Sequence, residues 1–515
     1  MSSGNHGCLD KQRQKGKLPI QIVQNPSKMV REKEILLHWI SKLVARKKVG
    51  ALLLFVIFTV FFIGALLVGE EAEDVQEGDL VLNIGLTDRM TLSYPEPSPI
   101  FGEQSKNITS SGDILGVIPN LALPPPPTAS LEYTLPPEHP CSNFTSPTPQ
   151  FIKKKLNRLP CPVCYLPVEK ALALMPKVPS PSPVLKNLTY IYEENLSRKT
   201  EFGGSDFGGY PSLKQRADSY DIKESMSVHC GFVRGIKPGN NTGFDMDEDD
   251  LLDMKQCNGV VVASAIFGNF DEINQPKNIG KYAKETVCFY MFIDEQTEAY
   301  KKSSASLRSS KKIGLWRIVV VHNLPYMDPR RNGRIPKHLL HRIFPNARYS
   351  MWIDGKLQLV VDPYQILERF LWRTNATFAI SRHYARFDVY KEAEANKAAK
   401  KYSNTSIDFQ IEFYRREGLT PYTQEKLPIT SDVPEGCVII KEHVPISNLF
   451  NCLWFNEVDR FTPRDQLSFS TVRDKIRAKT NYTISMFLDC ERRSFVVQKL
   501  HRSLLLLLHH LNNHQ

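Results

Sequence analysis

The chain has 515 residues, of which 42% are hydrophobic and 23% are charged, so it can build a large packed core and is not a wholly disordered protein. Its net charge is +11, but residues 1–48 hold eleven basic and three acidic side chains, which leaves only +3 for the other 467 residues. A nucleic-acid-binding domain needs a basic face on its folded part. The nearly neutral remainder therefore argues against that class of protein.

Residues 49–68 form an apolar run of 20 residues without a charge or a proline. As a helix this run would span about 30 Å, the thickness of the bilayer hydrocarbon. Lys42, Arg46, Lys47 and Lys48 precede it, and only acidic charges follow it up to residue 88. A signal peptide would have a shorter apolar core and a cleavage site. We therefore predict a cytoplasmic basic tail (1–48) and an uncleaved signal anchor (49–68) of a type II membrane protein, with the rest of the chain in the lumen.

Glycosylation sequons and cysteines support this orientation. Nine of the ten cysteines follow the apolar run, which permits disulfides and leaves an odd thiol. No sequon precedes the run, as expected if only the later residues are lumenal. The predicted glycosylation sites are Asn107, Asn143, Asn187, Asn195, Asn240, Asn375, Asn404 and Asn481.

Proline is concentrated after the anchor, with 20 of the 35 prolines between Pro95 and Pro183. This composition favours extended, solvated backbone and predicts a stem over residues 69–140. We expect a cysteine-containing, stem-proximal subdomain over residues 141–255. Its Cys161-Pro-Val-Cys164 could be a zinc half-site or a redox pair, but no second CxxC or histidine pair follows, so structural disulfides are favoured. The acidic run at residues 245–253 could bind a cation but more often marks a solvated surface loop.

From residue 256 onward, short apolar runs alternate with helical patterns, which predicts an α/β domain with a mostly parallel sheet over residues 256–498 and a short tail over 499–515. In such a sheet, ligands bind beyond the carboxyl ends of the strands. The predicted strands are 258–267, 285–293, 315–322 and 348–353, and the predicted helices between and after them are 277–284, 334–344 and 363–372.

Three acidic residues fall at or just beyond predicted strand ends, namely Asp271, Asp294 and Asp354. They point to a polar, nucleotide-sized ligand. Asp354 lies in Trp352-Ile353-Asp354-Gly355-Lys356, where nucleotide-sugar transferases often carry an Asp-x-Asp that holds Mn²⁺ or Mg²⁺. Here Lys356 replaces the second acid. Either Asp354 holds a divalent cation or Lys356 stabilises the diphosphate directly, and these alternatives predict opposite metal dependence. Asp354 could also simply cap a turn.

Other polar residues are candidates for binding or catalysis. Arg334, Lys337, His338, His341 and Arg342 lie on one predicted helix, which is either a phosphate clamp or a solvated face. His383 could be a general base beside Arg386, because its ordinary pKa suits proton transfer near neutral pH, although a lone histidine in a loop is often structural. Asp465 is a further candidate or a helix cap, and Glu435 and His443 are weaker ones. The motifs of serine hydrolases, zincins and P-loop proteins are missing.

Several segments resemble a plant glycosyltransferase-like family of mucilage-related and turgor-regulation-defect proteins. They begin with the HPC and CPVC segments near residues 139 and 161 and cover more than two-thirds of the predicted lumenal part. The others are NGVVVASAIFGNFDEINQP, NGRIPKHLLHRIFPNARYSMWIDGKLQL, SRHYARFDVYKEAEA, VPEGCVIIKEH and RDQLSF.

This resemblance implies a GT-A-like nucleotide-binding domain in a type II Golgi membrane protein. It implies a hexosyltransferase that uses a nucleotide sugar to extend a pectin or mucilage polysaccharide, with a Golgi glycosyltransferase complex as a further partner. It places Asp354 and Lys356 at the donor diphosphate, Asp294 near the nucleoside, and His383, Arg386 and Asp465 toward the acceptor. One branch of the family is described as an alkaline ceramidase, so an amide hydrolase with His338, His341 or His383 as metal ligands is an alternative. A non-catalytic Golgi scaffold is another.

Overall fold

The structure is a computed structural model that describes residues 135, 138–144, 159–194, 201–235, 237–304, 306–307 and 309–502. The predicted tail, anchor and stem lie outside these ranges, apart from the isolated positions before Cys141. None of the helices in the described ranges has the length and apolar character needed to cross a bilayer.

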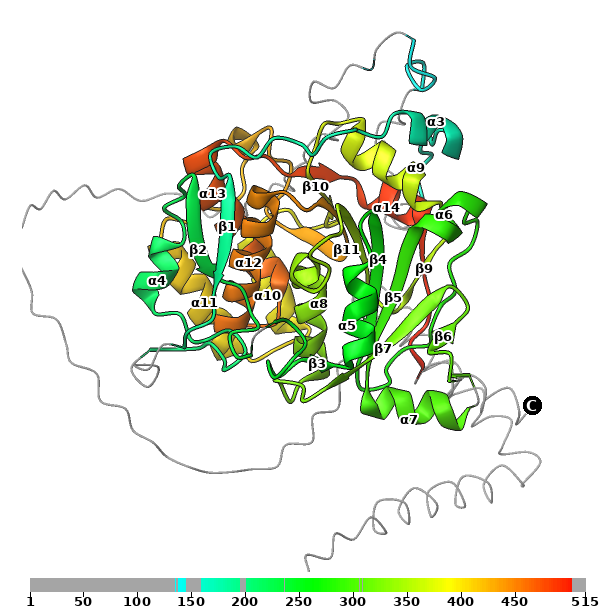
Figure 1. The fold of residues 1–515 in the computed structure, drawn as a ribbon. Coiled ribbons are helices and arrows are strands. Elements are labelled where there is room, and N and C mark those ends of the chain that lie inside the picture. Colours follow the sequence, from blue (N-terminus) through cyan, green and yellow to red (C-terminus); the bar gives the residue numbers. More distant parts are fainter. Residues whose placement is uncertain are drawn as a thin grey trace, which may run out of the picture. The chain divides into compact units, whose positions relative to one another are not determined.

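A nine-stranded sheet forms the centre of the molecule, in the order β12-β10-β11-β8-β4-β5-β7-β3, with β6 beside β7 (Figure 1). Its four central strands, β8-β4-β5-β7, are parallel and confirm the four predicted strands. The strands are β3 (Asp245–Met246), β4 (Val260–Ile266), β5 (Val287–Asp294), β6 (Lys312–Ile313), β7 (Trp316–His322), β8 (Tyr349–Ile353), β10 (Phe378–Arg382), β11 (Pro434–Glu442) and β12 (Ser485–Phe487).

The complete sheet is mixed, so the prediction of a mostly parallel sheet holds only for its centre. β11 runs antiparallel to both β8 and β10, and β3 and β6 run antiparallel to β7. The chain leaves β10, forms two helices and then enters the gap between β8 and β10 from the opposite end. Apolar runs predict strands, but they do not encode the direction in which a strand enters the sheet.

Helices cover both faces of the sheet, and each face has its own core. β4 alternates between the two, because Val261 and Ala263 belong to one cluster and Val260 and Val262 to the other. The first face is covered by α8 (Pro329–Ile343), α12 (Pro445–Arg460) and α13 (Asp465–Thr480). The second is covered by α6 (Lys281–Thr286), α9 (Pro363–Leu367), the π-helix η5 (Glu368–Trp372) and α14 (Asp489–Phe495).

The described residues do not divide at the predicted boundary between 255 and 256. Leu185, Phe207 and Val228 share a core with β4, and β3 is part of the main sheet. Two strands make a separate parallel sheet in this region. The elements are α3 (Val168–Ala173), β1 (Asn187–Ile191), α4 (Leu213–Asp218), β2 (Ser225–His229) and α5 (Glu248–Lys255).

The acidic run at residues 245–253 is not a solvated loop. It forms β3 and the first turns of α5, where Asp250 is fully buried. Asp250 pairs with Lys311 at 2.9 Å and with Arg317 at 3.2 Å. Composition alone predicted exposure, but the helical period turns Asp250 and Met254 toward the interior.

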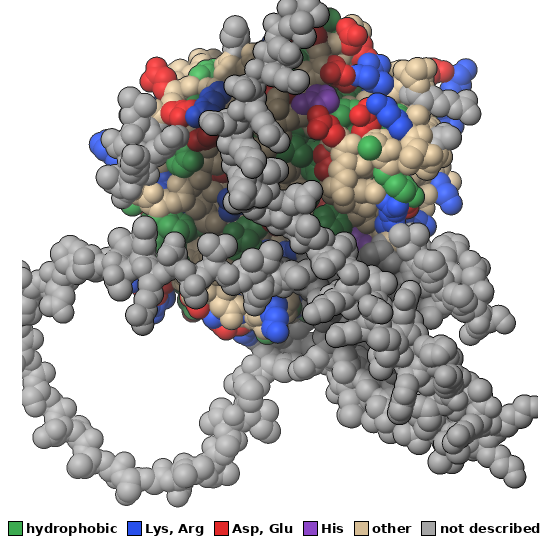
Figure 2. All heavy atoms as spheres, turned by 90° about the horizontal axis from the view of Figure 1, so that it is seen from below, with side chains coloured by type: hydrophobic (Ala, Val, Ile, Leu, Met, Phe, Trp, Pro, Cys, Tyr) green, Lys and Arg blue, Asp and Glu red, His purple; other side chains and the backbone are tan. Residues whose placement is uncertain are grey.

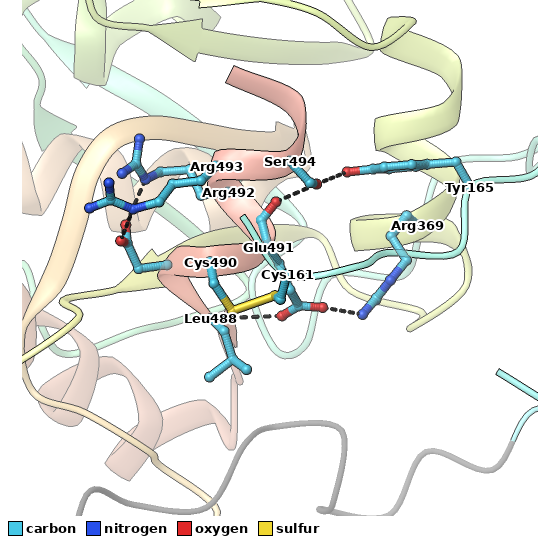
Figure 3. The surroundings of a disulfide bond; sticks show 10 residues. Cys161, Tyr165, Arg369, Leu488, Cys490, Glu491, Arg492, Arg493 and Ser494 are labelled. Atoms are coloured by element: carbon cyan, nitrogen blue, oxygen red, sulfur yellow. Dashed lines mark hydrogen bonds and ion pairs between the residues drawn. A yellow bond between two sulfur atoms is a disulfide. The ribbon is translucent and has the colours of Figure 1, made fainter. Parts of the chain in front are cut away.

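Disulfides confirm the prediction for the CxxC, since its two cysteines have different partners. The bridges are Cys141–Cys164, Cys161–Cys490, Cys230–Cys452 and Cys257–Cys288, and Cys437 is a buried free thiol. Figure 3 shows Cys161–Cys490 joining the first part of the described chain to α14. Beside it, Tyr165 Oη lies 2.7 Å from Ser494 Oγ, and Arg369 pairs with Glu491 at 2.5 Å.

The central parallel strands end at the lower side of Figure 1, where α7 follows β5 directly. Figure 2 looks onto this side and shows acidic, basic and apolar side chains mixed over it. The remaining elements are α7 (Glu295–Ser303), β9 (Leu357–Leu359), α10 (Val389–Ala398), α11 (Asn404–Arg416), the 3₁₀-helix η6 (Gln424–Lys426) and β13 (Val496–Gln498).

Candidate active site

Asp354 lies directly after β8, at the carboxyl edge of the sheet. Its backbone N–H donates to the carbonyl of Cys437 on β11 at 2.9 Å, which fixes the turn that follows the strand. The indole Nε1 of Trp352 donates to Asp354 Oδ1 at 2.7 Å. The Asp354 side chain is 29% exposed. The carboxylate is therefore held in one orientation and is open to a ligand.

Gly355 allows this turn to pack closely against β4. A Cβ at this position would lie 2.8 Å from the carbonyl oxygen of Ala265 and 3.5 Å from Asp271 Oδ2, so a larger residue would push the turn outward. Asp271 is partly buried, and its Oδ1 lies 2.7 Å from His501 Nδ1. The structure thus places the predicted residues Asp271 and Asp354 close to the same glycine, Gly355.

The predicted residues Arg334, Lys337 and Asp465 form a buried ion-pair cluster next to Asp354. Lys337 Nζ lies 2.6 Å from Asp465 Oδ2 and 4.0 Å from Asp354 Oδ1. Arg334 Nη1 lies 2.9 Å from the same oxygen of Asp465. Lys337 is only 2% exposed, so this part of α8 is not the solvated face that was one alternative.

The two halves of α8 contact different parts of the molecule. Pro336 lies inside the helix, and Leu339 has non-helical backbone angles. Residues before this kink contact Asp465, whereas Arg342 after it donates to the carbonyl of Cys230 at 2.8 Å and lies over the Tyr190 ring. His341 and Arg342 are therefore not part of a phosphate clamp at the sheet edge.

Within the cluster, burial and neighbouring charges shift the pKa of Asp465 in opposite directions. Burial by itself would raise the pKa of Asp465, but Arg334 and Lys337 lower it below its ordinary value, so the carboxylate stays ionised. Burial lowers the pKa of His338 well below its ordinary value, so its ring is neutral. This ring packs against Trp454 at 4.4 Å between centroids, and neither ring nitrogen has a hydrogen-bond partner in the described part of the chain.

Arg464 is a site residue that the sequence analysis did not assign. One guanidinium nitrogen donates to Gln466 Oε1 at 3.0 Å, but the buried Nε–H has no acceptor among the described residues. A buried donor without an acceptor is costly and calls for an external partner. Arg464 occupies the N-cap position of α13, directly before Asp465. Its position next to a predicted site residue is the feature of the sequence that could have identified it.

The Asp294 carboxylate already accepts hydrogen bonds from neighbouring groups of the protein, which does not support its predicted contact with a nucleoside. It N-caps α7, and its carboxylate accepts from the backbone N–H of Thr297 at 2.9 Å. It also accepts from the Gly268 N–H at 2.6 Å and the Thr297 hydroxyl at 2.5 Å. An acid between a strand and a helix is equally suited to capping and to ligand binding, and here it holds the turn after β4 in place.

The geometry likewise favours the structural alternative for His383 over a general-base role. Its ring is 3% exposed, and Nδ1 accepts from the backbone N–H groups of Ala385 and Arg386 at 3.1 and 2.9 Å. The Arg386 guanidinium pairs with Glu392 and also contacts the other nitrogen of the ring. His383 and Arg386 therefore stabilise their own loop, a local use that residue type alone does not disclose.

Glu435 is more exposed than His383. It lies at the start of β11, where the pairing with β10 shifts register between Ile380 and Ser381, and its side chain is partly exposed. Such bulges often redirect a side chain beside an active site. The negative charge of Glu435 favours the charged forms of Arg464 and Arg492. The next residue, Gly436, lies close to the ammonium group of Lys337.

The residues around Asp354 do not fit a divalent metal. Lys337 Nζ lies 4.0 Å from Asp354 Oδ1, and the residues that the structure describes hold no trio of ligand side chains that includes Asp354, whereas a hard cation requires several oxygen ligands. Within the described chain, a single trio of side chains has metal-ligand spacing, and it consists of Cys230, His341 and Cys452. Its two sulfur atoms form a disulfide and are not thiolates. Among the described residues, His338, His341 and His383 do not form such a trio with one another.

Residues 188–501 match the family model "TOD1/MUCI70, glycosyltransferase-like domain". The chain is 63% identical over 506 residues to the Arabidopsis thaliana protein named "Probable hexosyltransferase MUCI70", covering 97% of this chain and 87% of that protein. It is 39% identical over 296 residues to "Alkaline ceramidase TOD1" of Arabidopsis thaliana, covering 56% and 62% of the two chains.

Two solved structures show weaker similarity. One is the apo form of mouse xyloside xylosyltransferase 1, with 9% identity, 45% of this chain and 85% of that chain covered, and a TM-score of 0.27. The other is the bifunctional glycosyltransferase WbbM, with 12% identity, 45% and 39% covered, and a TM-score of 0.25. Scores this low do not establish a shared fold.

Proposed function

The chain belongs to the TOD1/MUCI70 glycosyltransferase-like family, and we propose that it is a hexosyltransferase that moves a sugar from a nucleotide sugar to a cell-wall polysaccharide. The observation that carries the proposal is the partly exposed Asp354 carboxylate, held by Trp352 at the carboxyl edge of the sheet beside the buried ammonium group of Lys337. A nucleotide sugar has hydroxyl groups for the carboxylate and a diphosphate for the cations.

Side-chain cations supply the charge that holds the diphosphate. Arg334 and Lys337 pair with Asp465, and Lys337 also lies 4.0 Å from Asp354. Arg464 and Lys356 lie close to these two carboxylates in the sequence and add two further positive charges. The Nε–H of Arg464, which has no acceptor among the described residues, can donate to a phosphate oxygen. Asp354 then accepts a hydrogen bond from a hydroxyl of the donor. This arrangement needs no divalent cation between the phosphates.

Transfer breaks the bond between the anomeric carbon and the diphosphate oxygen and forms a bond from that carbon to an acceptor hydroxyl. The acceptor proton passes to Glu435, and the diphosphate leaves with the electrons of the broken bond. Lys356 and Arg464 stabilise its growing negative charge, which is the main task of such a site. Asp465 acts through Lys337 and Arg334, because it is buried and paired with both.

We also propose the setting of this reaction. The basic tail, the apolar run at 49–68 and the sequons that follow it support a single-pass type II protein of the Golgi membrane with its folded part in the lumen. The four disulfides fit an oxidising compartment. Asn143, Asn187, Asn375, Asn404 and Asn481 are exposed and Asn240 is partly exposed, as glycan attachment requires, whereas Asn107 and Asn195 lie outside the described residues.

The test is donor binding by the purified full-length chain in detergent, using uridine diphosphate hexoses and isothermal calorimetry. Asp354→Asn should weaken binding more than tenfold, because the amide cannot replace the charge and acceptor capacity of the carboxylate. The exposed Asp249 on α5 provides the control, and Asp249→Asn should bind as the wild type does. Equal affinity of Asp354→Asn and wild type for every donor that binds, or no donor binding at all, would overturn the proposal.

Metal dependence is tested in the same assay. Binding should survive EDTA, because Arg334, Lys337, Lys356 and Arg464 provide the charge. Loss of binding in EDTA with recovery in Mn²⁺ would contradict the assignment of the diphosphate to side-chain cations.

A further inference from the structure

A cavity of about 380 Å³ lies away from the carboxyl edge of the sheet, between β1, β2, α4 and α12. These elements lie side by side at the left of Figure 1. The volume is within the range of small-molecule sites, about 300–1,000 Å³. The candidate active site does not use any of its lining residues.

One face of α12 forms a wall of this cavity. Leu453, Asn456, Glu457 and Arg460 follow helical spacing and line it. Trp454 lies on a different face, where it packs against His338 and donates to the carbonyl of Asp465 at 2.8 Å. The same helix therefore separates the cavity from the ion-pair cluster beside Asp354.

The charges that line the cavity are already paired within the protein. Arg216 binds Glu457 and Glu417, each at 2.6 Å. Arg460 donates to the carbonyls of Phe202 and Pro211. At the rim, Asp218 pairs with Lys214 at 2.7 Å and Asp221 with Lys223 at 3.1 Å. A charged ligand would have to compete with these pairs, so a neutral ligand fits better.

The remaining lining combines neutral hydrogen-bonding groups with apolar surface. Hydroxyl and amide groups come from Ser219, Ser225, Ser227, Gln215 and Asn456, and apolar contact comes from Ile191, Met226 and Leu453. A sugar ring presents hydroxyl groups around its edge and C–H groups on its faces, so it matches both kinds of surface. Ser219, Ser227, Gln215 and Asn456 each make one hydrogen bond within the protein, and each side chain retains a further donor or acceptor for a sugar hydroxyl.

We propose that this cavity is a second glycan-binding site, which holds neutral hexose units of a polysaccharide at a distance from the reacting end. The proposal rests on the proposed function in one respect, the polysaccharide nature of the acceptor. A second contact of this kind raises the effective concentration of a polymer at the active site without changing the chemistry there.

The test uses the purified full-length chain and a panel of neutral hexasaccharides of glucose, galactose and mannose, with galacturonic acid hexamer as the charged counterpart. At least one neutral hexamer should bind more tightly than the acidic one. Ser225→Trp should weaken that binding more than tenfold by filling the cavity, whereas Ser310→Trp, at an exposed position away from it, should have no effect. Equal binding by Ser225→Trp and wild type, or no neutral hexamer bound, would overturn the proposal.

Two further measurements separate this proposal from folding effects and from the proposed function. In the wild type, the bound hexamer should slow amide hydrogen exchange in β2 and α4, and unchanged exchange in both elements would also overturn it. Donor binding should be lost in Asp354→Asn but kept in Ser225→Trp, whereas hexamer binding should show the reverse. If donors fail to bind anywhere while the hexamer binds at β2, the proposed function fails and the second site remains.

Discussion

Lys441 is the most deeply buried cation behind the active site. Its side chain is 1% exposed, and its ammonium group contacts the carbonyl of His338 at 3.2 Å and the Nδ1 of His341 at 3.5 Å. None of these contacts carries a negative charge. Burial therefore lowers the pKa of Lys441 to about 7, far below the ordinary value of a lysine.

This pKa predicts a pH dependence of stability. Between pH 7 and 10.5 the unfolded chain binds a proton at Lys441 that the folded chain has lost, so the free energy of unfolding should rise with pH by up to about 1.4 kcal/mol per unit. Lys441→Met removes the titrating group. Urea denaturation at pH 7.5, 8.5 and 9.5 should show a steeper rise for the wild type than for the variant, and the variant should gain most at pH 7.5. Parallel curves would refute the assignment.

Individual site residues could be predicted only where their surroundings follow from the strand pattern. Asp354 ends a buried strand, so its place at the sheet edge followed from the sequence. Asp294 and His383 have equally suggestive positions, but nearby backbone N–H groups occupy them, and those contacts depend on turn geometry. Arg464 could not be distinguished from a surface arginine until α13 had been packed against α12.

Among the elements, β11 has the greatest influence on the site. Its first residues form a bulge against β10 and at the same time pair with the turn that carries Asp354. Gly436 lies in this stretch with an ordinary backbone conformation, and a Cβ there would lie 3.0 Å from Lys337 Nζ and 3.3 Å from Asp465 Oδ2. The glycine is required for space and not for an unusual backbone angle.

Gly436→Ala should therefore affect binding more than folding. The added methyl group displaces the Lys337 ammonium, so we expect donor affinity to fall several-fold while the free energy of unfolding changes by less than about 1 kcal/mol. Gly259→Ala is the matched control, because no atom lies within 4 Å of the corresponding Cβ position. Calorimetry and urea denaturation of both variants provide the comparison. Unchanged donor affinity in Gly436→Ala would show that Lys337 does not contribute.

At the level of elements, the sequence predicted the centre of the fold and missed its borders. β4, β5, β7 and β8 are buried on both faces and appear as continuous apolar runs. β13 has three residues and pairs with β9 far back in the chain, so no local pattern indicates it. Its pairing brings Lys499 to Lys356 and His501 to Asp271, beyond the end predicted for the catalytic domain.

At the scale of the whole molecule, the disulfides differ in how far apart in the sequence their two cysteines lie. Cys161–Cys490 spans 329 residues, and Cys257–Cys288 spans 31. A longer loop restricts the unfolded chain more strongly. Which cysteines pair could not be predicted, because pairing depends on the path of the folded chain.

Loop length predicts the relative cost of removing these two bridges. Replacing Cys161 and Cys490 by serine should lower the free energy of unfolding by about 2 kcal/mol more than the same change at Cys257 and Cys288, in an entropic estimate that neglects the other bridges. Urea denaturation under non-reducing conditions measures both double variants. An equal or smaller loss for the Cys161 and Cys490 pair would show that α14 stays in place without its bridge.

The distance in sequence between Cys161 and Cys490 also bears on the order of events during biosynthesis. Ribosomes deliver a chain from its N-terminus, so in the lumenal setting proposed above Cys161 would enter the oxidising compartment hundreds of residues before its partner. Until then it is a reactive thiol that can be held by a thiol-disulfide oxidoreductase. A chain that ended before residue 490 would lack the native partner of Cys161. Formation of the disulfide at Cys161 would thus distinguish a chain whose synthesis has reached Cys490 from one that stopped earlier.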